Sequence, residues 1–491
     1  MKKIFLGLLL IMFMMIGCNK NEATKEIQIQ LSDERVTVDD NDINEDSTQA
    51  VYKANDIIYY AAGKDFTYGE GTKKDEHSQS EADQHTVIHI TKPGTYILSG
   101  ELSLGQVAVD LGEEAIHDPN AVVTLVLNNV DITCEVAPAI IFYNVYECGN
   151  TNEDTATKDI DTSKAGANVI IADDTINNIN GSYVAKIYKS YELNEEGNEV
   201  VDSKKLHKYD GAFYSKQTLN INGGTKDNGI LNITAENEGL DSELHLTING
   251  GIINIKSGND GINTNEDNIS VTTVNGGNVN IICDGSTGEG DGIDSNGWLV
   301  INGGSVFAQA CATSGDAGID SDKGIYINGG KIVATGNMLD RISGGNQTYA
   351  VFTFTNRQAA NSTYTLKNKE DKAIGEYTIN NSFTYLIISK DELVEGDYTL
   401  WQDNKQLVGS TMKGMKPSFK EENMQKPDGD KPQMPDMNIP NGERPDKPNG
   451  DKVPPNGFDS MLDGSDFHDV ETSEIFRIVK GANQFSNVSY R

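Results

Sequence analysis

Cysteine, tryptophan and basic residues are scarce in this 491-residue chain, and each scarcity excludes a class of protein. There are five cysteines and two tryptophans, and no pair of cysteines has a CxxC spacing. This argues against a disulfide-scaffolded domain and against a zinc or redox site. Only 40 Lys and Arg oppose 74 Asp and Glu, which gives a net charge of −34. Such a field repels nucleic acid and anionic membrane surfaces and attracts cations, so we expect no nucleic-acid partner.

Long apolar runs are also rare, and the one that is present lies at the N-terminus. Residues 4–16 form this apolar run. The end of the run and the next two residues, Met15-Ile16-Gly17-Cys18, resemble a bacterial lipobox. The run is shorter than a transmembrane helix requires. We predict that 1–17 is a lipoprotein signal peptide and that Cys18 carries the lipid. The protein would then be extracellular, with the lipid as its only attachment to the bacterial cell membrane; a general secretory signal with a chance cysteine is the alternative.

An internal repeat is the strongest feature of the sequence. Asn-Gly-Gly begins at Asn222, Asn249, Asn275, Asn302 and Asn328, at intervals of 27, 26, 27 and 26 residues. Short alternating strands flank each copy, and glycines separate them, which is typical of one coil of a right-handed parallel β-solenoid. Asparagine side chains cap turns by bonding to the backbone. We therefore interpret these asparagines as a structural ladder along the stacked coils.

The sequence predicts an all-β protein, a right-handed parallel β-helix with coils of 26–27 residues and a small antiparallel β cap. Charged insertions at 149–165 and 189–207 would project from one corner of the coils. The predicted parts are the signal peptide 1–17, an acidic tether 18–50, the β-helix 51–338, the cap 339–412, a Pro/Gly/Met-rich disordered insertion 413–466 and a terminal strand segment 467–491.

Acidic residues recur at matching places in successive coils. Asp241, Asp294 and Asp320 each stand eight residues before the next Asn-Gly-Gly asparagine, and Asn263 takes the same place in its coil. Parallel pairing would stack these positions about 4.8 Å apart, where like charges repel by about 1 kcal/mol even in water. Either some carboxylates stay protonated, or cations bridge them. Oxygen ligands without His or Cys favour Ca²⁺.

Two further columns flank the first one, three residues earlier and two residues later, with Asp316 one step out of register. Turn capping is the alternative explanation for any one of these residues. We predict that several Ca²⁺ ions are bound by residues drawn from Glu238, Asp241, Glu243, Asp260, Asn263, Asn265, Asp291, Asp294, Asn296, Asp316, Asp320 and Asp322.

Candidate ligand-contacting residues outside the columns are few. Trp298 could stack on a sugar ring or pack at a corner of the coils. Lys216 and Lys323 each adjoin a column and could contact substrate, although a salt-bridge role is the preferred explanation for both. The sequence leaves open the disulfide state of its remaining cysteines, which are Cys134, Cys148, Cys283 and Cys311.

Several segments together resemble a family of bacterial cell-surface proteins, the carbohydrate-binding domain-containing proteins. The resemblance extends over about residues 85–410, and it rests on 89–100, 123–132, 211–216, 291–295, 389–393 and the Asn-Gly-Gly coils. It implies a right-handed parallel β-helix shaped like pectate lyases, with several Ca²⁺ ions. It also implies binding of plant-wall polysaccharides, notably polygalacturonate and cellulose, without established catalysis. The insertions at 149–165 and 189–207 depart from the family pattern.

We therefore predict a surface-anchored, calcium-dependent protein that binds polysaccharide without catalysis. The polysaccharide is expected to be acidic and pectate-like, with cellulose as a further possibility. A calcium-dependent polysaccharide lyase is the first alternative, in which Lys216 or Lys323 would be the base that removes a proton next to a uronate carboxylate. A structural adhesin with purely structural calcium is the second.

Overall fold

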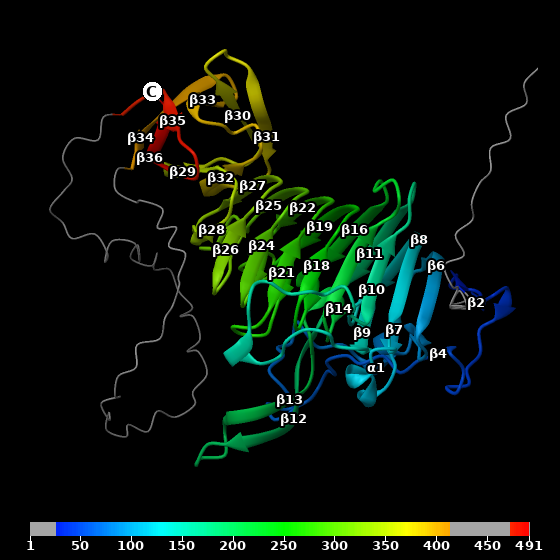
Figure 1. The fold of residues 1–491 in the computed structure, drawn as a ribbon. Helices are drawn as coiled ribbons and strands as arrows, with labels where there is room; N and C mark the ends of the chain where they lie inside the picture. The colour runs from blue at the N-terminus through cyan, green and yellow to red at the C-terminus, as the bar shows by residue number, and fades with distance from the viewer. Residues whose placement is uncertain (1–25, 413–471, 491) are drawn as a thin grey trace, which may run out of the picture. The chain divides into compact units, whose positions relative to one another are not determined.

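The computed structural model describes residues 26–412 and 472–490, and its chain divides into two compact units, Met1–Gly345 and Asn346–Arg491. The predicted signal peptide, Cys18 and the Pro/Gly/Met-rich insertion lie outside the described residues. None of the helices in the described part is long and apolar enough to cross a membrane. The structure is mostly β, with long parallel sheets in the first unit (Figure 1).

Strands of the first unit form three parallel stacks, which the chain visits in turn. The first stack contains β6 (Gly94–Leu102), β8 (Val123–Cys134), β10 (Ala167–Ile171), β15 (Leu219–Gly223), β18 (Leu246–Ile248), β21 (Val271–Val274), β24 (Trp298–Ile301), β26 (Gly324–Ile327) and β28 (Ile342–Gly344). The second contains β11 (Ile176–Gly181), β16 (Ile230–Ala235), β19 (Ile252–Ser257), β22 (Asn278–Cys283), β25 (Ser305–Gln309) and β27 (Lys331–Gly336). The third contains β5 (Thr86–Ile90), β7 (Gly105–Asp110), β9 (Ile140–Asn144), β14 (Gly211–Ser215), β17 (Glu238–Ser242), β20 (Ile262–Thr264) and β23 (Ile293–Ser295).

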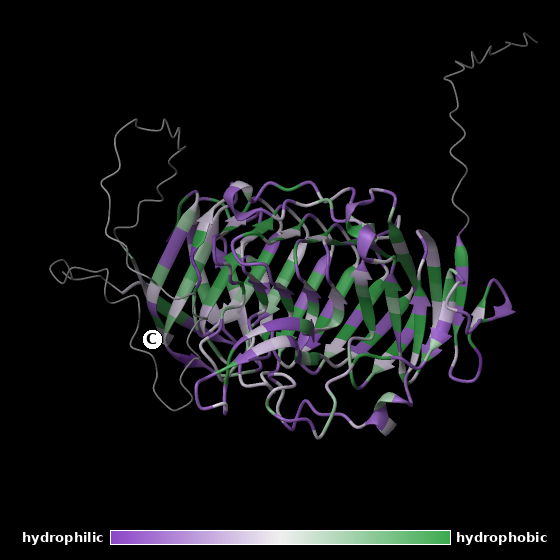
Figure 2. Cartoon of the chain, turned by 90° about the horizontal axis from the view of Figure 1, so that it is seen from below, coloured by the Kyte–Doolittle hydropathy of each residue, from purple (hydrophilic) through white to green (hydrophobic). Residues whose placement is uncertain are grey.

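The spacing of the sequence repeat is the spacing of the strand pairing. Leu219 pairs with Leu246, Leu246 with Thr272, Thr272 with Leu299 and Leu299 with Ile325, which are steps of 27, 26, 27 and 26 residues. Alternate residues of each strand point inward and stack on their equivalents, and Figure 2 shows the resulting alternation of hydrophobic and hydrophilic positions along the strands. The buried core of the first unit is made of these aliphatic columns.

The Asn-Gly-Gly asparagines form the predicted ladder. From Asn249 onward, the side-chain amide of each asparagine donates to the carboxamide oxygen of the asparagine in the preceding coil, from Asn249 on Asn222 at 2.9 Å to Asn328 on Asn302 at 2.8 Å. Asn222 itself donates to the carbonyl of Val169 at 3.3 Å. A second asparagine ladder, which the sequence analysis did not anticipate, joins Asn178, Asn232, Asn254 and Asn280 on the second stack.

The N-terminal region differs from the expected acidic tether. Ile27–Leu31 forms β1, which pairs in parallel with β6 and buries Ile29 and Leu31. β2 (Thr37–Val38), β3 (Asn41–Asp42) and β4 (Val51–Ala54) follow, and β4 is antiparallel to β5. The acidic composition hides the short alternation of Ile27, Ile29 and Leu31, which is enough to add a strand to an open edge.

The charged insertion at 189–207 is a β-hairpin rather than a loop. β12 (Val184–Leu193) pairs antiparallel with β13 (Val200–Tyr209) and projects from the stacks (Figure 1). The insertion at 149–165 contains one short 3-10 helix, Glu153–Thr155. The other helices described are α1 (Gln79–Ala82), whose Ser78 and Glu81 form a capping box, and a second 3-10 helix, Glu113–His117.

The second unit is largely antiparallel. It contains β29 (Tyr349–Gln358), β30 (Ser362–Asn368), β31 (Ala373–Ile379), β32 (Phe383–Ser389), β33 (Gly396–Gln402), β34 (Lys405–Thr411), β35 (Phe476–Ile478) and β36 (Ala482–Tyr490). β36 pairs in parallel with β29, so the end of the chain belongs to this unit. Phe352, Phe476 and Phe485 pack against one another in its core. The role of this unit as a cap stays a prediction.

Because the coils stack closely, even the methyl group of an alanine at position 239 is expected to destabilise the fold. A Cβ there would lie 2.6 Å from the carbonyl oxygen of Gly261 in the next coil, whereas a Cβ at Gly315 would meet no atom within 4 Å. We expect Gly239→Ala to lower the free energy of unfolding by about 1–3 kcal/mol and Gly315→Ala to change it by less than about 0.5 kcal/mol. Thermal melts of both variants check this, and equal melting temperatures would contradict it.

Candidate metal centre

The acidic columns lie on the third stack of strands, where backbone pairing sets their register. Asp241 pairs with Asn263, and Asn263 with Asp294, while Tyr214 occupies the same position in the coil before Asp241. The backbone N–H of Asp320 donates to the carbonyl of Ile293 at 2.7 Å, which continues the column. The predicted stacking of this column is therefore confirmed, although its role as a set of ligands stays a prediction.

The two flanking columns also keep their predicted register. The backbone N–H of Gly239 donates to the carbonyl of Asp260, and that of Gly261 donates to the carbonyl of Asp291, both at 3.0 Å. These bonds align Glu238, Asp260 and Asp291 in successive coils. Gly292 bonds in the same way to Ala317, so Asp316 stands one residue before this column, as the sequence indicated. The third column is aligned by N–H bonds to the preceding coil and contains Glu243, Asn265, Asn296 and Asp322.

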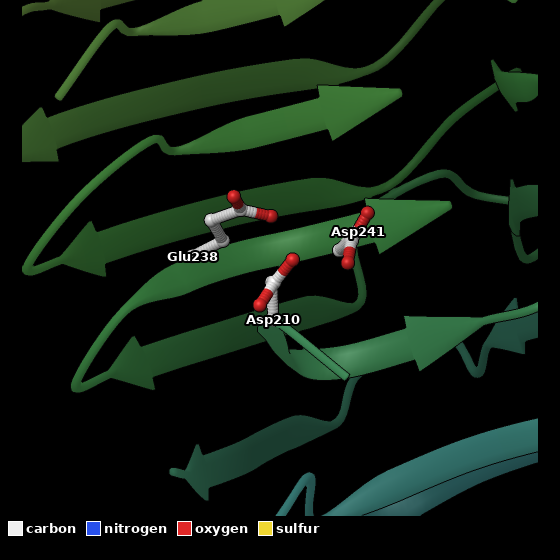
Figure 3. A group of neighbouring side chains, drawn as sticks. All are labelled: Asp210, Glu238 and Asp241. Carbon is white, nitrogen blue, oxygen red and sulfur yellow. The ribbon is translucent and has the colours of Figure 1, made fainter. Parts of the chain in front are cut away.

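Three carboxylates converge at the N-terminal end of these columns. Asp210, Glu238 and Asp241 each offer an oxygen within 4.8 Å of the others, and Figure 3 shows the side chains turned toward one another. Asp210 immediately precedes β14, while Glu238 and Asp241 come from the neighbouring strand β17. Their exposed fractions are 8 %, 6 % and 0 %, so the whole group is buried.

Oxygen atoms in this group lack hydrogen-bond partners. Glu238 Oε2, Asp241 Oδ2 and Asn263 Oδ1 are buried and accept no hydrogen bond. The neighbouring amides are already used, because Asn263 Nδ2 donates to Glu238 Oε1 at 3.0 Å and Asn265 Nδ2 donates to Asp241 Oδ1 at 2.7 Å. A buried oxygen without a donor costs about 1–3 kcal/mol, and more when charged. A cation would supply the positive charge that these oxygens lack, and the all-oxygen donor set fits a hard ion such as Ca²⁺.

Burial and mutual repulsion raise the pKa of the three carboxyl groups. Desolvation is the largest cause at each one, and it is joined by Asp241 acting on Glu238 and by Asp210 acting on Asp241. Asp210 is also raised by desolvation, but the Lys208 ammonium opposes that shift in its pKa. The protonated and the metal-bound state are therefore alternatives for this group, as the stacked charges led us to expect.

A second acidic group lies farther along the same columns. Desolvation raises the pKa of Asp260, Asp291 and Asp320, and neighbouring carboxylates raise it further. Asp340 faces Asp320, and desolvation is the main reason that its pKa is raised to about 7. These oxygens are better satisfied than those of the first group, since Asp260 accepts from the N–H of Asp291 at 2.7 Å and Asp316 from that of Gly290 at 2.6 Å.

Sequence reasoning missed Asp210 and two lysines beside it. Lys208 Nζ lies 2.6 Å from Asp210 Oδ2, and Lys205 Nζ lies 2.7 Å and 3.0 Å from the two oxygens of Glu243. Both lysines come from β13, so the hairpin delivers them. Asp210 stands one residue before the place of Glu238 in its coil, as Asp316 does in its own, and that offset was the available signal.

An open pocket adjoins the carboxylates and the lysines. Its volume is about 350 Å³, and it is lined by Lys205, Lys208, Asp210, Glu243, Asn265, Glu266, Asp267 and Asn296. The pocket is almost wholly polar in its lining residues, with the lysines opposed by acids and amides. It could hold a ligand rich in hydroxyl groups with one charged group, because carboxylates and amides accept bonds from hydroxyls.

The other predicted contact residues lie outside this pocket. Lys216 is exposed at the end of β14, and its N–H donates to Phe142 O at 2.9 Å. Trp298 begins β24, and Lys323 Nζ stands 6.0 Å from the centre of its ring. Cys134, Cys148, Cys283 and Cys311 are free thiols, which answers the question the sequence left open.

The raised pKa values predict an unusual pH dependence for the metal-free protein. A carboxyl with a raised pKa keeps its proton in the folded chain while the unfolded chain loses it near pH 3.8. The contribution of this group to the free energy of unfolding is then fully present below that pH. It is lost as the pH rises through the pKa that the group has in the folded chain. We expect the melting temperature in chelator to fall between about pH 5 and pH 7.5. Exposed acids such as Asp173 and Asp174 act in the opposite direction but are screened by solvent.

Asp340→Asn provides the matched measurement, because it removes a group whose pKa is raised to about 7. Its melting temperature should depend less on pH than that of the wild type. A wild-type melting temperature that rises steadily from pH 5 to pH 7.5 in chelator would contradict the assignment.

Comparison with known proteins agrees with the family resemblance. A solved structure titled as the polysaccharide lyase-like protein from C. thermocellum, a gadolinium derivative, is 18 % identical, with a TM-score of 0.32, over 61 % of this chain and 91 % of that one. No curated protein matches the chain. The sequence profile of the carbohydrate-binding domain-containing proteins matches residues 84–193 and 167–399. These matches cover most of the three stacks and the acidic columns, and the chain belongs to the family of carbohydrate-binding domain-containing proteins.

Proposed function

We propose that this protein binds polysaccharide in a calcium-dependent manner and does not cleave it. The observation that carries the proposal is the group of buried, partnerless oxygens on Glu238, Asp241 and Asn263. Membership of the carbohydrate-binding domain family supports the ligand class. The three stacks that present the site are, in this proposal, the faces of a right-handed parallel β-helix, because each strand pairs in parallel with its equivalent one coil away.

Calcium is the metal we propose for Asp210, Glu238 and Asp241. The site offers carboxylate and amide oxygens, with Asn263 beside the three acids, and Ca²⁺ takes six to eight oxygen ligands. When bound, the ion would supply positive charge that can also coordinate a carboxylate or hydroxyl of the ligand. The second acidic group, around Asp260, Asp291 and Asp320, is our candidate for a further ion, in keeping with the several ions that the columns predict.

An acidic glycan is the ligand that best fits the charge of the protein. A chain with a net charge of −34 repels a polyanion unless a cation lies between the two. Calcium held by the protein and shared with uronate carboxylates removes this obstacle. A neutral glycan such as cellulose would instead need aromatic surfaces, for which Trp298, with Lys323 beside it, is a candidate.

Binding without cleavage follows from the state of the nearest amine. A lyase needs a neutral base beside the calcium to remove a proton from the uronate. Asp210 raises the pKa of Lys208 in the metal-free protein. An exposed lysine amine that has lost this partner is still protonated at neutral pH by its ordinary pKa, so Lys208 is not a neutral base in either state. Lys216 and Lys323, the bases that the lyase alternative requires, lie outside the pocket.

We further propose that Cys18 anchors the protein by lipid on the outer side of the bacterial cell membrane.

Calcium should stabilise the first unit. Binding to the folded state alone adds about 2.7 kcal/mol to the free energy of unfolding at a hundredfold excess over Kd. Asp241→Asn removes one ligand charge from the buried group, so we expect it to lose most of the calcium-induced rise in melting temperature. Asn302→Ala breaks the turn ladder instead, and it should melt lower while keeping the calcium affinity of the wild type. Equal calcium affinities for the two variants in calorimetry would reject the site.

Pectate is the direct test of the ligand. We expect the protein to be retained on insoluble pectate in calcium and released by chelator, because the two polyanions need a bridging cation. Added NaCl should weaken retention only modestly, since screening acts mostly on exposed charges. Incubation with soluble pectate should leave the absorbance of unsaturated products unchanged. Retention in excess chelator would reject bridging, and accumulating unsaturated ends would favour the lyase.

A further inference from the structure

The β12–β13 hairpin places a lysine on a carboxylate that belongs to the candidate metal centre. Lys208 and Asp210 are two residues apart, at the end of β13 and before β14, and their side chains lie 2.6 Å apart. Asp210 is also one of the three acids that converge, and among the described residues its carboxyl is the only one of the three that forms an ion pair. The hairpin thus brings its own cation to the site.

Lys208 and a divalent ion would compete for the carboxylate of Asp210. An ammonium 2.6 Å from Asp210 stands close to any ion bound between Asp210, Glu238 and Asp241, and the two positive charges repel each other. The Lys208 side chain is 43 % exposed, and its ammonium group is carried on a flexible chain of methylene groups. The ammonium group can therefore move away from Asp210. Metal binding is therefore expected to displace Lys208 toward the adjoining pocket, which it already lines.

The residues that line the pocket are of two chemically different kinds. Lys205 and Lys208 are basic, and both are neutralised in the structure by Glu243 and Asp210. The acidic and amide residues are Asn265, Glu266, Asp267 and Asn296, with Asn296 Nδ2 donating to Asp267 Oδ1 at 3.0 Å. An anion therefore finds no unpaired lysine among the lining residues until a metal ion compensates Asp210. Hydroxyl groups, in contrast, find acceptors on the acidic and amide residues at any time.

We propose that metal binding releases Lys208 from Asp210 and that the released lysine binds the carboxylate of a uronate residue in this pocket, with the sugar hydroxyls bound by its acidic and amide residues. This inference rests on the proposed function, which it deepens by assigning the uronate a site of its own. The lysine acts as an internal counter-cation in the absence of metal and as a ligand-binding residue in its presence. Calcium and uronate would then bind with positive coupling, each favouring the state that the other requires.

Calcium titration of Lys208→Gln tests the exchange. The variant removes the competing cation, so its calcium affinity by calorimetry should rise by about three- to tenfold, the size of a modest ion-pair interaction. Lys204→Gln is the matched control, because Lys204 is an exposed residue of the same strand outside the pocket. Its calcium affinity should stay that of the wild type. An unchanged or weaker affinity in Lys208→Gln would overturn the exchange.

Trigalacturonate binding in saturating calcium tests the second half. Lys208→Gln should bind this probe about tenfold more weakly than the wild type and Lys204→Gln, despite holding calcium more tightly. Lys208→Arg keeps the charge and should retain most of the affinity, which separates lost recognition from lost folding. Equal affinity of Lys208→Gln and wild type for trigalacturonate would overturn the pocket assignment. If the wild type itself binds no uronate, the proposed function fails, and the calcium titration alone still decides the exchange.

Discussion

Parallel backbone pairing at a fixed step of 26–27 residues is the constraint on which the rest of this structure depends. It places equivalent residues at the inter-strand distance, so that every chemical property of one coil is repeated about 4.8 Å away. Aliphatic residues in register give the buried columns of the core, and asparagines in register give two amide ladders. The same geometry stacks acids, for which proximity is costly.

The cost of stacking acids explains the chemistry of the site. Hydrogen-bonded asparagine can repeat indefinitely, because each amide is both donor and acceptor. A carboxylate only accepts, so a column that contains Asp241 and Asp294 needs protons, amides such as Asn263, or cations between the charges. At Glu238 and Asp241 the amides satisfy one oxygen each and leave another without a donor. The buried oxygens that lack a hydrogen-bond donor therefore lie together, at positions that the backbone pairing determines.

The β12–β13 hairpin brings positive charge to the acidic residues. In the chain, β12 and β13 are inserted between β11 and β14, and this hairpin places Lys205 against Glu243 and Lys208 against Asp210. An internal cation partly offsets the desolvation of Asp210 without metal, since Lys208 opposes the rise in its pKa. The insertion therefore links the candidate metal centre to the adjoining pocket, because two of the pocket's residues belong to β13.

The sequence by itself determined the repeat, the register of Asp241, Asn263 and Asp294, and the asparagine ladder, because each depends only on equal spacing along the chain. It did not predict β1, whose few apolar residues acquire meaning only against the open edge of β6. It also missed Asp210, which stands one residue out of register with Glu238, and Lys205 and Lys208, which lie outside the repeat and are brought to the acids by an insertion. Periodic positions can be placed by counting residues, whereas contacts made by an insertion depend on its path in space and were decided by the tertiary structure alone.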